Sequence, residues 1–306
     1  MLLSLVIPVF NEQEVIPALW QEVFQAMTSI TDDFEVLFVD DGSTDNSLQL
    51  LLGIQQSEKR AKVISLSRNF GHQAAYTAGL TFAKGDFIAM MDGDLQDPPM
   101  HIKPMLEMLQ NQNFEVVYGS RTERNESYFK QQLTAAFHRL FKRVSNINAP
   151  ENVGNFCVMT RQALDTFLEL KEKNRYLPGL RFFIGFNQGK YAYERPDRTI
   201  GNAKMSYSGL FKLAFDALFS FSNFPLKFCF YLGIFGVVIF FIAGTISLVH
   251  KIIGIASPGW SSTLISIYFL GSIQLLFLGI IGEYVYRIYV ESQNRPIYIV
   301  KKIYDK

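Results

Sequence analysis

Three carboxylates and an amide lie within six residues in the segment Met91-Asp92-Gly93-Asp94-Leu95-Gln96-Asp97-Pro98-Pro99. The segment follows an apolar run, residues 87–91, that has the character of a buried strand. Carboxylates this close repel one another, and a hard divalent cation with oxygen ligands offsets the repulsion. An Asp-x-Asp pair at the end of a buried strand can therefore hold a metal ion against a diphosphate. The alternative is a polar turn in which Asp97 caps a helix beginning at Pro98.

A second acidic segment follows another apolar run and reads Asp40-Asp41-Gly42-Ser43-Thr44-Asp45. A carboxylate at this place can accept the ring N–H of a uracil base. Ser43 or Thr44 can cap a following helix, but capping leaves the adjacent Asp40 and Asp41 unexplained. The segment therefore favours a binding role beside a structural one.

Two further polar segments also follow apolar runs. Asn11 and Glu12 come after the first run, and Arg68-Asn69-Phe70-Gly71-His72 comes after the third. Asn11 and Glu12 are open to two interpretations, a helix cap with a first-turn acid or a pair of ribose ligands. Each segment alone is a weak signal, but four of them after successive apolar runs indicate one shared site.

The elements that must position these segments alternate along the first 120 residues. The predicted strands are 3–9, 34–39, 62–66, 87–91 and 115–118, and the predicted helices are 12–29, 45–56, 72–83 and 99–112. A second, weaker set of strands is expected in 151–200. This alternation predicts an α/β fold with a mostly parallel sheet covered on both faces. Ligands of such sheets bind beyond the carboxyl ends of the strands, where all four polar segments fall.

The rest of the chain predicts a membrane anchor. Lys and Arg number 29 against 28 Asp and Glu, so the net charge favours no nucleic-acid partner. Residues 228–249 and 263–282 contain no charged side chain, and each is long enough to cross a bilayer as a helix. We expect transmembrane helices at about 226–250 and 263–286, after an amphipathic interfacial helix over 206–223. The alternatives are helices buried in a large soluble domain.

Flanking charge predicts the orientation of this hairpin. Basic residues precede the first span and follow the second, whereas the link between the spans offers only Lys251 and His250. The flanking basic residues are Lys204, Lys212, Lys227, Arg287, Arg295, Lys301, Lys302 and Lys306. The positive-inside rule then places the large domain, both termini and the 288–306 tail in the cytoplasm, with the protein integral to the cytoplasmic (inner) membrane. Cys157 and Cys229 lie far apart in the sequence, so we expect free thiols and no zinc site.

Short motifs in a fixed order run along nearly the whole chain. They are Ile7-Pro8-Val9-Phe10-Asn11-Glu12, Val39-Asp40-Asp41-Gly42-Ser43, Ser67-Arg68-Asn69-Phe70-Gly71-His72, Asp92 to Pro99, Gly119-Ser120-Arg121, Arg198-x-x-Gly201-x-x-Lys204, Gly282-Glu283-Tyr284 and Asn294-Arg295-Pro296-Ile297-Tyr298. In these motifs the chain resembles the family 2 glycosyltransferases of GT-A fold. More narrowly, it is similar to the polyprenyl-phosphate glycosyltransferases, the group of dolichyl-phosphate mannose synthase and the bactoprenol glucosyltransferases.

The resemblance implies a GT-A catalytic domain over 1–205 and a role for each motif. By resemblance, Asp92, Asp94 and Gln96 surround Mg²⁺ or Mn²⁺ and the donor diphosphate. The residues implied to hold the nucleotide sugar are Pro8, Asn11, Glu12, Asp40, Asp41, Asn69, Gly71, Asp92 and Gly93. Arg121 and Arg198 resemble the arginines that clamp the acceptor lipid phosphate, and guanidinium matches phosphate bidentately. Lys130 could assist, although a solvated position would also explain it.

One position departs from the pattern of the bactoprenol glucosyltransferases. Their Gly-Asp-Phe-Arg-Leu segment carries an Asp proposed as catalytic base, and the matching run here is Gly154-Asn155-Phe156-Cys157-Val158. Asn155 cannot accept a proton at neutral pH. A phosphate monoester has a second pKa of about 6, so the acceptor oxygen is already largely ionised. We therefore expect catalysis without a protein base here, with Asn155 bonding the sugar or the acceptor.

The predicted function is inverting transfer of a single hexose from a nucleotide sugar, UDP-glucose first among the candidates, to polyprenyl phosphate, with Asp94, Arg121, Arg198 and Asn155 as the catalytic set. Alternatives are UDP-GlcNAc or another UDP-sugar as donor. A processive polysaccharide synthase would carry a Gln-x-x-Arg-Trp motif, which neither Trp20 nor Trp260 provides. A non-catalytic membrane scaffold is the remaining class. The relatives also imply a homo-oligomer, for which glycines in the spans would permit close helix packing.

Overall fold

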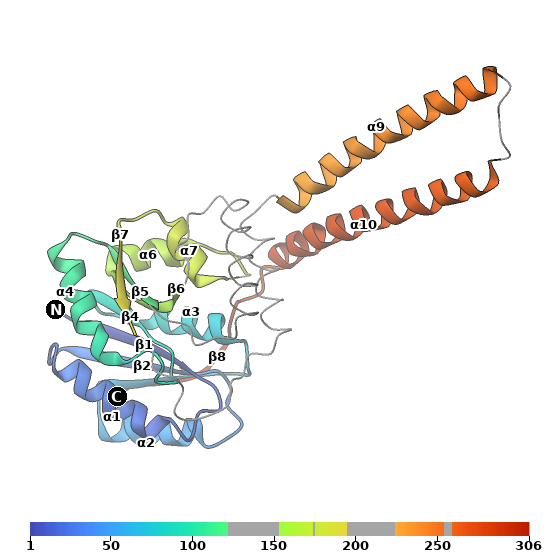
Figure 1. Cartoon of the computed structure of the whole chain (residues 1–306). Coiled ribbons are helices and arrows are strands. Elements are labelled where there is room, and N and C mark those ends of the chain that lie inside the picture. Colours follow the sequence, from blue (N-terminus) through green and yellow to red (C-terminus); the bar gives the residue numbers. More distant parts are fainter. Residues whose placement is uncertain (122–152, 174, 195–223, 254–258, 306) are drawn as a thin grey trace. The chain divides into compact units, whose positions relative to one another are not determined.

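The computed structural model describes residues 1–121, 153–173, 175–194, 224–253 and 259–305 (Figure 1). These residues fall into two units. The first unit contains the described residues up to 194 and the tail from Pro296, and the second contains 224–253 and 259–295. The predicted interfacial helix over 206–223 lies outside the described residues.

The first unit is built on an eight-stranded sheet in the order β7-β5-β6-β4-β1-β2-β3-β8. Its strands are β1 (Leu3–Val9), β2 (Phe34–Asp40), β3 (Ala61–Leu66), β4 (Phe87–Met90), β5 (Val116–Arg121), β6 (Val153–Thr160), β7 (Gln188–Tyr193) and β8 (Val300–Tyr304). Only β6 and β8 run antiparallel to their neighbours. The α/β prediction with a mostly parallel sheet is confirmed, and each predicted strand has a counterpart.

Helices cover both faces of this sheet, as Figure 1 shows. On one face lie α1 (Ile16–Thr28), α2 (Ser47–Ser57), the 3₁₀ turn η1 (Pro99–His101) and α4 (Ile102–Asn111); on the other lie α3 (His72–Phe82), α6 (Arg161–Glu169) and α7 (Leu177–Phe183). β1 is buried along its whole length because alternate side chains meet different helices. Leu5 packs in the core of the α1 face, whereas Val6 lies under Gly79 of α3.

The C-terminal tail adds the edge strand β8, which the sequence patterns did not predict. β8 pairs antiparallel with β3, and Ser67 N donates to Ile299 O at 2.9 Å just beyond the regular ladder. Lys62 Nζ lies 3.6 Å from Asp305 Oδ2 at the other end. The strand therefore covers the backbone edge of β3, directly before the segment that begins at Arg68.

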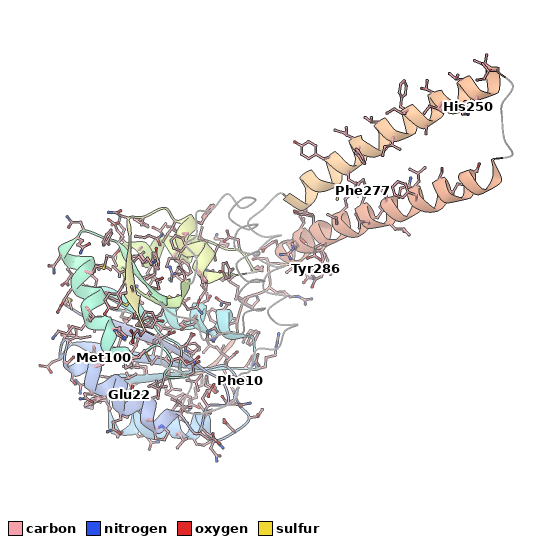
Figure 2. The ribbon with its side chains drawn as sticks, in the orientation of Figure 1. Phe10, Glu22, Met100, His250, Phe277 and Tyr286 are labelled. Carbon is pink, nitrogen blue, oxygen red and sulfur yellow. The ribbon has the colours of Figure 1, made fainter. Side chains whose placement is uncertain are left out.

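The second unit consists of α9 (Phe224–Ile252) and α10 (Trp260–Ser292), which run as a pair joined through residues 253–259 (Figure 1). Gly233 of α9 faces α10, because a Cβ at that position would lie 3.6 Å from the ring of Phe277. His250 lies near the C-terminal end of α9 (Figure 2). Many apolar side chains on both helices face outward: Phe241 is 76% exposed and Leu275 is 72% exposed.

The membrane prediction is met in part. Among the described residues, one segment is both long and apolar enough to cross a bilayer, Phe269–Ser292 of α10, with a mean hydropathy of 1.5. The apolar segment of α9, Tyr231–Ile246, falls short of that length. Both expected helices exist, but α10 continues past the predicted end of its span and carries a Glu283–Arg287 ion pair of 2.9 Å in its last third.

Candidate active site

Four polar loops gather at the carboxyl-terminal edge of the sheet. β1, β2, β3 and β4 run parallel, so the segments that follow them emerge on the same side. Phe10, the first residue beyond β1, marks this edge in Figure 2. The residues expected to hold the donor all come from the last positions of these strands and the loops behind them: Pro8, Asn11, Glu12, Asp40, Asp41, Asn69, Gly71, Asp92 and Gly93.

The loops after β1 and β2 bind one another through side chains. Asn11 adopts a left-handed backbone (φ 53°), its N–H donates to Ser43 Oγ at 3.0 Å, and its Oδ1 accepts from Thr44 N at 2.8 Å. Glu12 N donates to Ser47 Oγ at 2.9 Å. Asn11 thus joins two loops, and its predicted role as a ribose ligand stays a prediction. The Glu12 carboxylate is partly exposed at the same edge.

The predicted helix cap at Ser43 or Thr44 is wrong. α2 begins at Ser47, and its N-cap residue, Asn46, makes no side-chain capping bond. Ser43 instead serves the loop junction, because its N–H donates to Asp40 Oδ1 at 3.1 Å. The other oxygen of Asp40 accepts from Ser65 Oγ at 3.3 Å. The loop therefore uses its polar side chains to connect neighbouring strands.

Asp41 holds the loop after β3. Its two carboxylate oxygens accept from Phe70 N at 2.7 Å and Gly71 N at 2.9 Å. Burial raises the pKa of Asp41, with a smaller contribution from the nearby Asp40, while the two backbone donors act in the opposite direction. Asp41 orients the Phe70–Gly71 backbone, and each of its oxygens keeps acceptor capacity toward a ligand.

Gly42 explains how closely these two loops approach. Its φ is +70°, and a Cβ there would lie 2.6 Å from Arg68 C and 2.7 Å from Asn69 N. Both facts require glycine, since an L side chain would be strained and would overlap backbone atoms. Asn69 is thereby fixed at the edge through its backbone, and its side chain is exposed.

Pro8 and Gly93 make the junction between β1 and the Asp-x-Asp loop. The ladder between β1 and β4 ends at the Val6–Met90 pair, followed by a bond from Met91 N to Val6 O, so Pro8 removes no donor from the sheet. A Cβ on Gly93 would lie 3.1 Å from Pro8 O. The chain can thus turn tightly at Gly93 and leave Asp92 and Asp94 on either side of this contact.

Asp92 is tied to the first turn of α3. Its Oδ1 accepts from Tyr76 OH at 2.6 Å and lies 3.0 Å from His72 Nε2. Burial opposes the charged imidazole, but the nearby carboxylates of Asp92, Asp94 and Asp41 raise the pKa of His72 overall. Burial together with Asp92 raises the pKa of Tyr76 well above its ordinary value, so the phenol stays protonated and donates.

Asp94 and Gln96 form the next turn of the same loop, both partly exposed. Asp94 Oδ1 accepts from Gln96 N at 3.1 Å, and Leu95 between them has a φ of 59°. No group of three or more His, Cys, Asp or Glu side chains suited to a metal ion is found in the part of the chain that the structure describes. Oxygen donors from Asp94 and Gln96 nevertheless suit a hard cation that completes its shell with phosphate oxygens and water.

The alternative role of Asp97 as a helix cap is also wrong. The following turn begins at Pro99 with Pro98 in the N-cap position and no side-chain cap. Asp97 is fully buried, and its Oδ1 accepts a short hydrogen bond from Tyr193 OH of β7. Asp97 therefore anchors the Asp-x-Asp loop to the far side of the sheet.

Strands β6 and β5 continue this edge beyond β4. Met90 pairs with Cys157 in the antiparallel β4–β6 ladder, and continuing that register by two residues brings Asn155 level with Asp92. Asn155 is buried, and its Oδ1 meets no hydrogen-bond partner within the described ranges. Arg121 ends β5 at the same edge. The Arg121 side chain, Lys130 and Arg198 lie outside what the structure describes.

Sequence reasoning missed the part played by His72 and Tyr76. His72 stood inside a quoted motif but received no role, and Tyr76 received none. The available signal was their spacing of four residues at the start of a predicted helix, which places both side chains on one face. Their rings meet edge to face with centroids 4.9 Å apart, both beside Asp92.

Comparison with known proteins gives consistent matches. Residues 4–168 match the family described as "Glycosyl transferase family 2". An uncharacterised glycosyltransferase of Bacillus subtilis, YkcC, is 41% identical over 303 residues, which cover 98% of this chain and 94% of that one. The bactoprenol glucosyl transferase of Shigella phage SfII is 35% identical over 304 residues, 99% of this chain and 98% of that one. Among solved structures, glucosyl-3-phosphoglycerate synthase from Mycobacterium tuberculosis in complex with UDP superposes with a TM-score of 0.46 at 18% identity, covering 71% of this chain and 78% of that one.

Proposed function

The chain belongs to glycosyl transferase family 2 and is a glycosyltransferase, and on that premise we propose that it transfers one hexose from a nucleotide sugar to polyprenyl phosphate. The donor we propose first is UDP-glucose. The Shigella phage relatives are named for bactoprenol and for glucosyl transfer, and we extend that acceptor and that sugar to this chain. UDP-GlcNAc or another UDP-sugar is the alternative donor.

The observation that carries the proposal is the gathering of loops at one edge of the sheet. The β1, β2 and β3 loops supply buried carboxylates that keep acceptor capacity for a nucleoside, and the β4 loop supplies the Asp-x-Asp pair beside them. A donor lying across this edge would place its base and ribose over β1 to β3 and its diphosphate over β4. This placement agrees with the general rule for ligands of parallel sheets.

We propose that Mg²⁺ or Mn²⁺ binds with the donor at Asp94 and Gln96, with Asp92 beside them. Mg²⁺ is usually held by one or two carboxylates plus substrate phosphates, so the absence of a three-acid cluster from the described residues does not conflict with it. Asp92 Oδ1 already accepts from Tyr76 and lies beside His72, so Asp94 is the stronger ligand candidate. The bound ion would stabilise negative charge on the leaving diphosphate.

The exposed apolar surface of the second unit supports a lipid acceptor that is embedded in a membrane. α9 and α10 present large exposed apolar surfaces, which a protein in water rarely does. We propose that both helices insert in the cytoplasmic membrane, with the catalytic domain and both termini on the cytoplasmic side. For α9 this assignment rests on the uncharged run 228–249, because the described apolar segment is shorter than a span.

The proposed reaction is a single in-line displacement. An oxygen of the acceptor phosphate attacks the anomeric carbon, the new carbon–oxygen bond forms as the bond to the nucleoside diphosphate breaks, and the leaving diphosphate takes the electron pair. The product has the opposite anomeric configuration. Because the second pKa of a phosphate monoester is about 6, the attacking oxygen needs orientation more than deprotonation. Asn155 sits level with the Asp-x-Asp loop and can bond a substrate hydroxyl without acting as a base.

The test is a transfer assay with membranes that contain the full chain. Radiolabelled UDP-glucose and undecaprenyl phosphate are mixed with and without EDTA, and the organic phase is analysed for labelled lipid. We expect a lipid-linked hexose that requires divalent metal. Absence of a lipid product with every member of a nucleotide-sugar panel would refute the proposed reaction, and transfer that survives EDTA would refute the metal site. The same panel decides between UDP-glucose and UDP-GlcNAc.

A further inference from the structure

A buried arginine that forms no ion pair with a described carboxylate lies close to the carboxyl-terminal edge of the sheet. Arg181 of α7 is 2% exposed, and its Nη2 donates to Gly154 O at 3.2 Å. Its guanidinium lies close enough to Cys157 to act against the rise that burial causes in the pKa of that thiol, and it stands 5.6 Å from the ring centroids of Tyr118 and Phe182. Its Nε is buried without a hydrogen-bond partner, and no ion pair with a described residue offsets its charge.

Arg175, a second buried arginine only six residues away, shows what a purely structural arrangement looks like. Its guanidinium donates to Leu170 O at 2.8 Å and to Phe167 O at 3.2 Å, at the carboxyl end of α6. Unpaired helix carbonyls carry partial negative charge, which favours a guanidinium there. Burial lowers the pKa of Arg175, and the nearby Glu172 only partly opposes this effect. Within the described residues neither arginine forms an ion pair, and each has a buried Nε without a hydrogen-bond partner, so the two differ in where they lie: Arg175 meets carbonyls at the end of α6, whereas Arg181 meets Gly154 beside Asn155.

Contacts connect Arg181 to the Asp-x-Asp loop through three buried side chains. Cys157, whose thiol pKa Arg181 influences, lies with its Sγ 3.6 Å from Met90 Sδ at the end of β4. Cys157 is also close enough to Tyr76 to act on its hydroxyl, and that hydroxyl donates to Asp92 at 2.6 Å. Arg181 therefore stands behind the same edge as Asp92, on the β6 side.

Sheet order decides which ligand can balance this charge. The proposed nucleoside and diphosphate positions lie over β3, β2, β1 and β4, and β6 comes next on the side away from the nucleoside. A hexose is neutral, so the remaining anion in the proposed reaction is the phosphate of the acceptor. A buried cation is unfavourable unless it is paired, and guanidinium pairs with phosphate through two parallel hydrogen bonds.

We propose that Arg181 binds the phosphate of the lipid acceptor, beside Asn155, whose unpaired Oδ1 accepts from a hydroxyl of the transferred sugar. The proposal rests on the proposed function, since it takes its anion from that reaction. It adds to the predicted clamp of Arg121 and Arg198 a third arginine, which sequence reasoning did not select. The signal for it was a single charge within the apolar run Leu180-Arg181-Phe182-Phe183.

The kinetic test compares Arg181→Gln and Arg181→Lys in the purified full chain, with Arg175→Lys as the matched control. Loss of a charge-assisted phosphate contact is expected to raise the acceptor KM about 10- to 100-fold in Arg181→Gln. Arg181→Lys keeps the charge without the planar fork, so a smaller rise is expected. The donor KM of Arg181→Lys should stay close to wild type. Arg175→Lys should leave the donor KM and the acceptor KM close to wild type, and it should lose at least as much melting temperature as Arg181→Lys, because Arg175 donates to two helix carbonyls.

A binding test separates this inference from the proposed function. Dodecyl phosphate is titrated into wild type, Arg181→Lys and Arg175→Lys in the same detergent, with dodecanol as the probe without phosphate. Wild type and Arg175→Lys should bind dodecyl phosphate alike, and Arg181→Lys should bind it several-fold more weakly even if no sugar transfer is ever found. This binding test uses only the Arg181→Lys variant, so it remains informative if Arg181→Gln does not fold.

Three results would overturn the inference. One is an acceptor KM that does not change in Arg181→Lys while wild type transfers sugar to the lipid. Another is a donor KM that rises in step with the acceptor KM, which would assign Arg181 to the donor diphosphate. The third is wild-type protein that binds dodecyl phosphate no better than dodecanol.

Discussion

The candidate active site at the carboxyl-terminal edge of the sheet has two halves, which are built in opposite ways. Over β1, β2 and β3, the polar side chains bind backbone groups of neighbouring loops, as Asn11 does with Thr44 N and Asp41 does with Gly71 N. Over β6, buried polar atoms of Asn155 and Arg181 meet no partner among the described residues. The first half is organised by the protein itself, and the second contains groups that a ligand would complete.

This difference predicts different consequences for substitution. A change in the half over β1 to β3 removes bonds that hold the loops, so it should lower stability and donor affinity together. A change in the half over β6 alters side chains that have a buried polar atom without a described partner, so it should alter acceptor kinetics more than donor kinetics. The Asp-x-Asp loop lies between the halves and should show a third pattern, loss of turnover in a folded protein.

Asp94→Asn is expected to have the largest effect. The asparagine Oδ1 can still accept from Gln96 N, so the turn should persist and the melting temperature should hold. The carboxylate charge at the proposed position of the donor diphosphate is lost, and kcat should fall about a hundredfold to a thousandfold. Turnover at saturating donor and acceptor is the measurement. A variant with near wild-type kcat would remove Asp94 from the metal and diphosphate position.

Asp41→Asn should affect folding and donor binding together. Two backbone N–H groups point at the two carboxylate oxygens, and an amide NH₂ in place of one oxygen would face a donor. Leaving one buried group unsatisfied costs about 1–3 kcal/mol of unfolding free energy. Because the Phe70–Gly71 backbone would shift, the donor KM should rise while the acceptor KM changes little. Urea unfolding and initial rates measure the two effects, and a normal donor KM in a destabilised variant would confine Asp41 to a structural role.

The elements of the fold were predictable because the sheet has a strong local signature. Leu3–Val9 is apolar except for Ser4, as expected for a central parallel strand buried on both faces, and it was predicted with its observed bounds. β8 gave no such signal: the run Val300-Lys301-Lys302-Ile303-Tyr304 is half exposed at a sheet edge, and its pairing with β3 joins residues more than two hundred positions apart.

Site residues were predictable by position more than by role. Strand ends and loop composition located Asp40, Asp41 and Asp92 at the correct edge. Their partners could not be read from the sequence, because the bonds from Asp41 to Phe70 and from Asp97 to Tyr193 depend on loop geometry and on sheet order. Arg181 lacked any motif, and what distinguishes it from the equally buried Arg175 is its bond to Gly154, the neighbour of Asn155.

Glu35→Gln tests whether effects on kinetics are confined to the carboxyl-terminal edge of the sheet, because Glu35 lies near the opposite end of β2. Its Oε1 accepts from Ser4 Oγ and Lys84 N, both at 2.6 Å, and its Oε2 lies 2.9 Å from Lys62 Nζ. The substitution of Glu35 by glutamine should lower the free energy of unfolding by about 1–3 kcal/mol at neutral pH and leave both KM values and kcat unchanged. A change in either KM would contradict the separation of the two edges.

The pH dependence of this loss follows from the pKa of Glu35. Burial raises that pKa, but the bonds from Ser4, Lys62 and Lys84 outweigh burial and lower it below the ordinary 4.5. A carboxyl with a lowered folded pKa stabilises the protein above the unfolded pKa, and the contribution disappears as pH falls through the folded value. The difference in melting temperature between wild type and Glu35→Gln should therefore be largest at neutral pH and shrink below about pH 4.5. A difference that grows toward low pH would show that the carboxylate is not stabilising.

Asn155→Asp should have the smallest effect on turnover, and it tests the half over β6 most directly. The acceptor phosphate is already largely ionised at neutral pH, so a carboxylate offers no base that the reaction lacks, and kcat should stay within about threefold of wild type. The new charge lies next to Gly154, whose carbonyl accepts from Arg181, so it should compete with phosphate and raise the acceptor KM. The substitution keeps the unpaired Oδ1 and replaces the amide nitrogen by a second oxygen in a buried position, so it should lower the melting temperature. The measurement is the pH profile of kcat with saturating acceptor. A rise in kcat by orders of magnitude, with a new ionisation in the acidic range, would show that catalysis needs a base at position 155 and that asparagine there impairs the enzyme.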